Sequence, residues 1–172
     1  MIFAFADDYS FGILSPGLHW QWFLARCSTM KADFRYTSDT VFDTFPWPQT
    51  PTKRQIAEVA AAAVALRALR REIMDRLGYS LRALYRTLEE PGANPLREAH
   101  TRHDAAVGAA YGMAVEKRGE ATDPLAFLLA LNLTLAAREN AGEKITPPGL
   151  PLPEAERAAF LTDDCVQVVD SP

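Results

Sequence analysis

Three charged side chains alternate with apolar ones in residues 31–37, and their types are those that can read a nucleic-acid base pair. Alternation at period two predicts a half-buried strand with Lys31, Asp33 and Arg35 on one face. The apolar residues expected to pack behind that face are Ala32, Phe34 and Tyr36. A lysine donates to guanine O6 and N7, and an aspartate accepts from cytosine N4. Lys31 and Asp33 therefore suit the two halves of one G·C pair; the alternative is a surface strand with ordinary charges.

A basic stretch in residues 53–86 has the charge that a phosphate backbone attracts. Eight lysine and arginine side chains there face three carboxylates, although the whole protein has a net charge of −4. Arg67 and Arg70 of this stretch, together with Arg26, are predicted to contact phosphates, which position a protein without specifying sequence. The alternative is a solvated helix face.

His100 and Asp104 lie one helical turn apart, a spacing that suits an orienting pair around a catalytic or metal-binding histidine. The alternative is a structural histidine that packs near the core and is tied to the carboxylate. The sequence contains no glycine-rich phosphate loop, no His-Glu-x-x-His motif and no Cys-x-x-Cys motif. We therefore expect no catalytic, cofactor-binding or metal-binding residue in this chain.

The elements that position these residues are predicted to be mainly α-helical, with a small α+β piece at the N-terminus. Capping residues and prolines mark helix starts, and glycines mark helix ends. These signals predict helices near residues 15–28, 53–77, 80–88, 94–111 and 124–138. One or two short strands are expected, in residues 31–37 and 41–45. The predicted buried stripe of the first helix consists of Leu18, Trp22, Phe23 and Ala25.

The periodicity of the sequence predicts three parts. Residues 1–52 are rich in aromatic side chains, and residues 53–153 follow the 3.6-residue period of helices. Residues 154–172 are expected to form a short helix and an acidic tail. Phe45 and Trp47 are predicted to pack the first part on the second.

Composition excludes several classes of protein. The chain has 172 residues, 48% apolar and 23% charged, which is typical of soluble globular proteins. No apolar segment has the length of a bilayer span and no signal peptide is recognisable, so no membrane partner is expected. Cys27 and Cys165 have neither a disulfide framework nor metal-ligand spacing, so we expect reduced thiols and a cytoplasmic location.

Several stretches of the chain occur in the order found in one family of enzymes. Those in the first part are Tyr9-Ser10-Phe11-Gly12-Ile13-Leu14-Ser15, His19-Trp20 through Arg26, Phe34-Arg35-Tyr36-Thr37-Ser38 and Val41-Phe42-Asp43-Thr44-Phe45-Pro46-Trp47-Pro48. This part resembles the end of the target-recognition domain of MmeI-like Type IIL DNA adenine methyltransferases, which often also carry restriction activity. Residues 84–88, 99–100, 104–107, 110–112 and 129–132 resemble the C-terminal helical domain of the same family.

The resemblance covers about residues 9–153 and implies a partner, double-stranded DNA, in a prokaryotic, nucleoid-associated protein. In the family, the region around Lys31 and Asp33 is where base-reading residues lie. The family's pattern differs at two positions, with an apolar residue in place of His103 and an aromatic one in place of Met113. These differences predict altered local packing.

The motifs of the family's catalytic core do not occur in this sequence. That core has a glycine-rich S-adenosylmethionine loop and an Asn-Pro-Pro-aromatic motif that holds the flipped adenine, whereas Asn94-Pro95 is followed here by Leu96. The resemblance therefore implies the DNA-recognition and structural C-terminal part of an S-adenosylmethionine-dependent adenine-N6 methyltransferase, inactive alone. The alternative is a helical docking module for a separate methyltransferase or nuclease chain.

Overall fold

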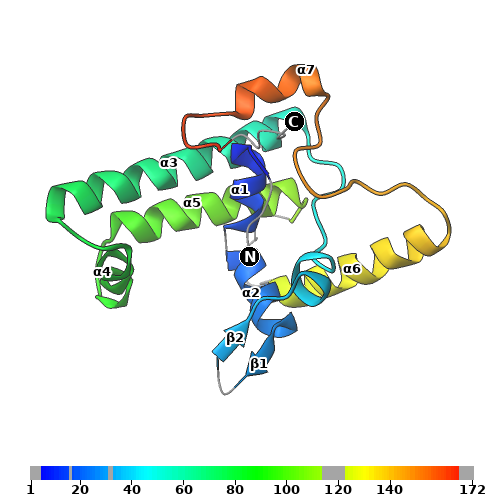
Figure 1. Ribbon diagram of the computed structural model, residues 1–172, viewed down its shortest axis with the longest axis horizontal. Helices are drawn as coiled ribbons and strands as arrows, with labels where there is room; N and C mark the ends of the chain where they lie inside the picture. The colour runs from blue at the N-terminus through cyan, green and yellow to red at the C-terminus, as the bar shows by residue number, and fades with distance from the viewer. Residues whose placement is uncertain (1–4, 16, 31–32, 114–122, 167–172) are drawn as a thin grey trace, which may run out of the picture.

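Two antiparallel helices, α3 and α5, lie side by side at the centre of the fold (Figure 1). The structure is a computed structural model that describes residues 5–15, 17–30, 33–113 and 123–166. In chain order the elements are α1 (Asp8–Leu14), α2 (Gly17–Arg26), β1 (Ser28–Met30), β2 (Asp33–Arg35), η1 (Ser38–Phe42), α3 (Lys53–Leu77), α4 (Leu81–Arg86), η2 (Thr87–Glu89), α5 (Pro95–Ala110), α6 (Pro124–Asn140), α7 (Glu154–Arg157) and η3 (Ala158–Phe160). Helix α1 crosses the α3–α5 pair, α4 closes one end of it, and α6 extends away from the other end.

Capping residues set the helix boundaries in the second part of the chain. Thr52 and Gln55 form a capping box in which each side chain accepts from the other's backbone amide, at 3.3 and 2.8 Å. Helix α3 ends at Gly78, whose φ of 65° favours glycine. Asn94 and Asp123 accept from backbone amides at the starts of α5 and α6. The helices predicted in this part are therefore confirmed, as is the mainly α fold class.

The main apolar core joins the N-terminal region to the helical half, through the residues predicted to do so. Phe45 and Trp47 are 4% and 3% exposed and lie in one cluster with side chains of α1, α2, α3 and α6. The Tyr111 hydroxyl donates to the Pro46 carbonyl at 2.8 Å, which fixes the same junction. A second cluster fills the space between α3, α4 and α5 and consists of Leu66, Ile73, Leu84, Leu96 and Ala99.

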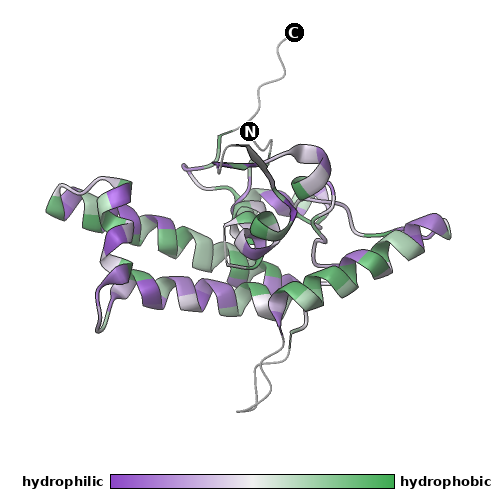
Figure 2. Ribbon diagram, turned by 90° about the horizontal axis from the view of Figure 1, so that it is seen from below, coloured by the Kyte–Doolittle hydropathy of each residue, from purple (hydrophilic) through white to green (hydrophobic). Residues whose placement is uncertain are grey.

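Helix α6 is apolar along most of its length (Figure 2). It contributes Leu128 and Leu135 to the buried side, while Leu129 and Leu133 are 46% and 62% exposed. The Asn132 amide donates to the Thr44 carbonyl at 2.7 Å and ties α6 to the N-terminal region. The core therefore uses only one side of this helix.

The sequence did not predict helix α1. Asp7 caps it by accepting from the Ser10 amide at 2.6 Å and from the Ser10 hydroxyl at 2.8 Å. A helix this short is marginal alone, and it is stabilised by packing on α3. The sequence of this region is rich in aromatic residues and lacks helical periodicity. It therefore gives no local sign of a helix that is stabilised by its packing on another helix.

Two local predictions in the first part are wrong. The strand predicted for residues 41–45 is instead the end of a π-helical segment, η1, followed by a turn at residues 43–44. Val41 is completely buried there, and its carbonyl accepts from the Trp22 indole at 3.1 Å. Ala25 of α2 is exposed, because the buried side of that helix consists of Leu18, His19, Trp22 and Phe23. The strand predicted for residues 31–37 is present as β2, but its partner β1 was not predicted.

Replacing Gly12 by alanine is expected to lower the free energy of unfolding by about 1–3 kcal/mol. A Cβ at this position would lie 2.6 Å from Val59 Cγ1 and 3.2 Å from the Val59 carbonyl oxygen, so α1 would move off α3. Urea unfolding measures the effect. The control is Gly108→Ala in α5, where the nearest atom, Met113 Cβ, is 4.0 Å away. Equal stabilities of the two variants would contradict the close packing of α1 on α3.

Candidate nucleic-acid interface

A two-stranded antiparallel hairpin projects beyond α2 at one end of the molecule (Figure 1). Its strands pair Ser28 with Arg35 and Met30 with Asp33. Asp33 and Arg35 are two residues apart on β2, so they share one face of the strand, and both are exposed. Lys31, the third of the predicted base-reading residues, falls between the two strands in sequence and lies outside the described residues. The hairpin therefore presents a carboxylate and a guanidinium side by side to solvent.

The other face of β2 is less covered than the sequence predicts. Phe34 is 58% exposed, so the prediction that it packs behind the strand is wrong. Its ring lies 6.1 Å from that of Phe23, centroid to centroid, with 70° between the ring planes. Tyr36 is half-buried, as predicted, and Ala32 lies outside the described residues.

Arg26 lies where α2 ends and the hairpin begins. Its side chain is exposed and its guanidinium is 5.7 Å from the centroid of the Trp22 ring. Within the described ranges this side chain makes no ion pair. It is therefore available for an anion close to the hairpin.

Arg67 has a different environment from Arg26. Its guanidinium pairs with the buried carboxylate of Asp8, lies 3.2 Å from Asp164 Oδ2, and is 4.8 Å from the Phe11 ring centroid. The Arg67 side chain is only 15% exposed. The adjacent Arg71 also pairs with Asp164, and this hydrogen-bonded pair lowers the pKa of the Asp164 carboxyl. The C-terminal segment, residues 154–166, thus supplies the carboxylate of Asp164 to two arginines of α3.

Arg70 is half-buried, with its guanidinium 5.4 Å from the Tyr85 ring centroid. Other cations of α3 have nearby acidic partners: Lys53 with Glu156, Arg54 with Glu58, and Arg76 with Glu72. The basic stretch seen in the sequence is therefore largely balanced in three dimensions. Lys53, Arg67 and Arg71 connect α3 with α1 and with residues 154–166, whereas Arg54 and Arg76 pair within α3 itself.

His100 and Asp104 do not form the pair that the sequence suggests. The His100 ring hydrogen-bonds the Tyr85 hydroxyl at 3.0 Å, and Asp104 Oδ1 accepts from the backbone amide of Gly17 at 2.9 Å. Asp104 therefore caps the start of α2 from another helix. Burial lowers the pKa of His100, with the positive charge of Arg70 contributing in the same direction.

His103, at a position where the resemblance predicts an apolar residue, is completely buried. Burial lowers its pKa, so the imidazole is neutral near pH 7. Across the described residues, no group of three or more histidine, cysteine, aspartate or glutamate side chains could hold a metal ion. In the same ranges, no helix combines the length and apolar character needed to cross a membrane.

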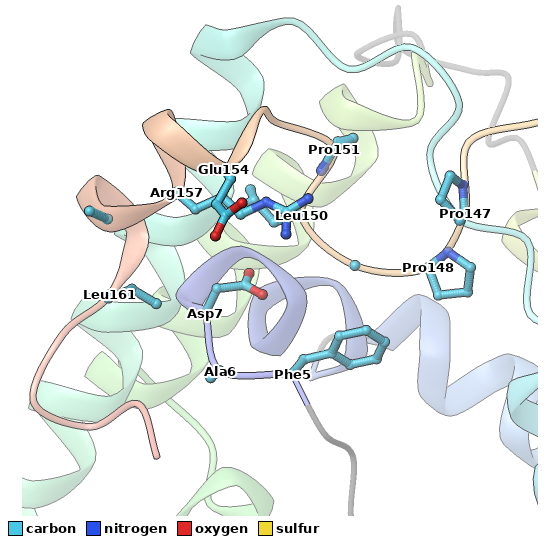
Figure 3. Close-up of a pocket in the computed structure, with 12 residues that line it drawn as sticks. Phe5, Ala6, Asp7, Pro147, Pro148, Leu150, Pro151, Glu154, Arg157 and Leu161 are labelled. Atoms are coloured by element: carbon cyan, nitrogen blue, oxygen red, sulfur yellow. The ribbon is translucent and has the colours of Figure 1, made fainter. Parts of the chain in front are cut away.

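A cavity of about 530 Å³ lies between the start of α1 and residues 147–161, a segment that begins with Pro147 and Pro148 (Figure 3). Its polar side chains include Asp7 and Arg157, and both are already used by the fold. Asp7 caps α1, and Arg157 Nε donates to the Leu152 carbonyl at 2.9 Å. Asp7 and Arg157 are therefore committed to the fold, while the exposed carboxylate of Glu154 also lines the cavity.

Sequence reasoning missed the residues that anchor the hairpin. His19 Nε2 lies 3.1 Å from the Tyr36 hydroxyl, and Phe23 stacks on Tyr36 at 5.4 Å between ring centroids. The alternation in residues 31–37 indicated that Tyr36 faces inward, but no local pattern indicates that His19 is its partner.

The fold and the site together define a helical scaffold that presents a small charged hairpin. Residues 1–49 match the family described as MmeI, target recognition domain. The chain is 33% identical over 108 residues to DNA methyltransferase A of Bacillus subtilis (strain 168), a match that covers 62% of this chain. It is also similar to a solved structure of the Type IIL restriction-modification enzyme MmeI in complex with DNA, with a TM-score of 0.64 and 28% identity over 77% of the chain.

These three matches confirm the resemblance to MmeI-like DNA methyltransferases that the sequence predicted, with residues 1–49 matching the target-recognition domain. The matched region spans 11% of the Bacillus methyltransferase and 17% of the MmeI chain. The similarity therefore concerns a small part of those enzymes, including the target-recognition domain.

Proposed function

We propose that this chain is the DNA-reading and structural C-terminal part of a site-specific DNA adenine-N6 methyltransferase. The catalytic core of that enzyme lies outside the 172 residues of this sequence. The observation that carries the proposal is the exposed β1–β2 hairpin, which lies within the region similar to the MmeI target-recognition domain. An enzyme that extrudes its target base needs a separate element to hold and read the surrounding duplex.

The hairpin has the chemistry that direct base reading requires. Asp33 offers an acceptor for cytosine N4, and Lys31, two residues earlier in the sequence, offers a donor for guanine O6 and N7. Arg35, on the same strand face as Asp33, adds a second donor within reach of the same groove. A two-stranded ribbon is narrow enough to enter the major groove.

Phosphate contacts are proposed mainly for Arg26, because it is exposed beside the hairpin and has no acidic partner in the described part of the chain. Arg67 and Arg70 remain candidates for the same role. A phosphate would have to displace Asp8 and Asp164 from Arg67, and Arg70 is half-buried, so both are weaker candidates than Arg26.

The purified chain alone is expected neither to bind S-adenosylmethionine nor to methylate DNA. The reason is that its sequence has no glycine-rich cofactor loop and that Leu96 follows Asn94-Pro95 where the catalytic motif needs a second proline. Transfer of a labelled methyl group from the cofactor to duplex DNA measures this. Incorporation of labelled methyl groups above that of a heat-denatured sample would contradict the proposal that the catalytic core lies outside this chain.

Arg26→Ala is expected to weaken duplex binding for all sequences alike and to reduce the slope of log affinity against log salt by about one. Binding of the chain to a fluorescent duplex over a salt series measures both effects. The control is Arg76→Ala, which removes an exposed arginine already paired with Glu72 and should leave the slope unchanged. If wild-type binding does not depend on salt, the chain does not bind DNA through phosphates and the proposal fails.

A further inference from the structure

His19 connects the hairpin to the main apolar core. It lies on the buried side of α2, is 6% exposed, and its Nε2 is 3.1 Å from the hydroxyl of Tyr36. The imidazole also meets the Phe45 ring edge-on, at 4.6 Å between centroids and 87° between planes. Phe45 belongs to the core that α3 and α6 share. A continuous series of contacts therefore runs from the core through His19 to Tyr36.

Tyr36 is the first residue after β2, directly following Arg35. Its ring stacks on two side chains of α2. The His19 ring lies 5.8 Å away with 30° between planes, and the Phe23 ring lies 5.4 Å away with 19° between planes. An isolated two-stranded hairpin is at best marginally stable in water. With β2 exposed along its length, the orientation of the hairpin depends on how the strand end is anchored.

Burying a histidine among mainly aromatic neighbours costs free energy, because the imidazole loses its contacts with water. Burial lowers the pKa of His19 to about 4. Burial, with a smaller contribution from Asp43, raises the pKa of Tyr36 to about 12. Both groups are therefore neutral near pH 7 and share one neutral hydrogen bond. A leucine would fill the same space without desolvating an imidazole, but it would provide no directional contact with the Tyr36 hydroxyl.

We propose that His19 is a positioning residue for base reading: through Tyr36 it fixes the orientation of β2, and with it Asp33 and Arg35, relative to the helical scaffold. This inference rests on the proposed function of the hairpin. His19 itself is buried and does not contact DNA.

The test of positioning is amide hydrogen exchange in the full chain. His19→Leu and Tyr36→Phe should each speed exchange in β1 and β2 by about 2- to 12-fold, the factor that corresponds to loss of one neutral hydrogen bond. The double variant should add little, since both changes remove the same contact. His19→Gln, which keeps a hydrogen-bonding group, should restore most of the protection. Tyr36→Phe retains the ring, so it provides a folded variant if His19→Leu is unstable.

The chain offers a matched control in its second histidine–tyrosine pair. The His100 ring lies 3.0 Å from the Tyr85 hydroxyl, between α5 and α4. His100→Leu removes an equivalent hydrogen bond and should leave exchange in β1 and β2 unchanged. If the His100 variant loosens the hairpin as much as His19→Leu, or if His19→Leu does not loosen it, the positioning role is overturned.

Selection from a randomised duplex DNA pool separates positioning from the proposed function. The wild-type chain should enrich a defined sequence, His19→Leu should flatten that preference, and His19→Gln should restore it. Enrichment unchanged by His19→Leu, in a chain whose hairpin has become looser, would overturn the link between positioning and reading. If the wild-type chain enriches no sequence, the proposed function fails and the reading role of His19 fails with it, whatever the exchange rates show.

Discussion

Replacing Arg67 by alanine is expected to lower the free energy of unfolding by about 3–5 kcal/mol, the cost typical of leaving a buried charge without its partner. Asp8 is 2% exposed and pairs directly with Arg67. The same guanidinium contacts Asp164 at 3.2 Å and Thr162 Oγ at 3.3 Å, so it joins α1, α3 and the C-terminal segment. Removing it leaves the Asp8 carboxylate in the protein without a cation.

Chemical unfolding of Arg67→Ala measures this cost, and two further variants test its cause. Arg76→Ala removes an exposed partner of Glu72 and should have a much smaller effect. In an Asp8→Asn background the Arg67→Ala change should cost less, because the buried carboxylate is gone. Equal losses for Arg67 and Arg76, or no coupling between Arg67 and Asp8, would contradict the structural role of this pair.

Local sequence signals predicted the helices whose ends depend on local chemistry. Thr52 and Gln55 mark the start of α3 and Gly78 marks its end, all within a few residues of the helix that they define. Helix α1 was not predicted, because its stability depends on the close approach of Gly12 to Val59, which is distant in sequence.

The sequence predicted the charged face of the candidate site, but not the residues that hold the hairpin against the helices. The alternation around Asp33 and Arg35 located one strand of the hairpin, and both side chains are exposed. The roles of Arg67 and Asp104 could not be predicted, since each contacts a residue far away in the chain, Asp164 and Gly17. The charge pattern of a helix shows its cations but not the carboxylates that the fold brings to them.

In an MmeI-like methyltransferase core that carries this chain as its C-terminal part, Lys31→Glu should weaken recognition of one G·C pair. The change places an acceptor against guanine O6 and N7 and leaves a desolvated charge unpaired. A lost base contact costs about 1–3 kcal/mol, or roughly 5- to 150-fold in discrimination. Exchanging both charges, with Lys31→Glu and Asp33→Arg together, should restore complementarity to the inverted C·G pair.

The most direct test of the proposed base reading is the profile of methylated sites for the wild type, both single variants and the double exchange, with all four bases sampled at each position. Base reading by the hairpin predicts that the double exchange changes the preferred base at one position and leaves the other positions unchanged. The Arg26→Ala variant should lower methylation at all sites alike. A profile unchanged by the double exchange would contradict base reading and would make Lys31 and Asp33 ordinary surface charges.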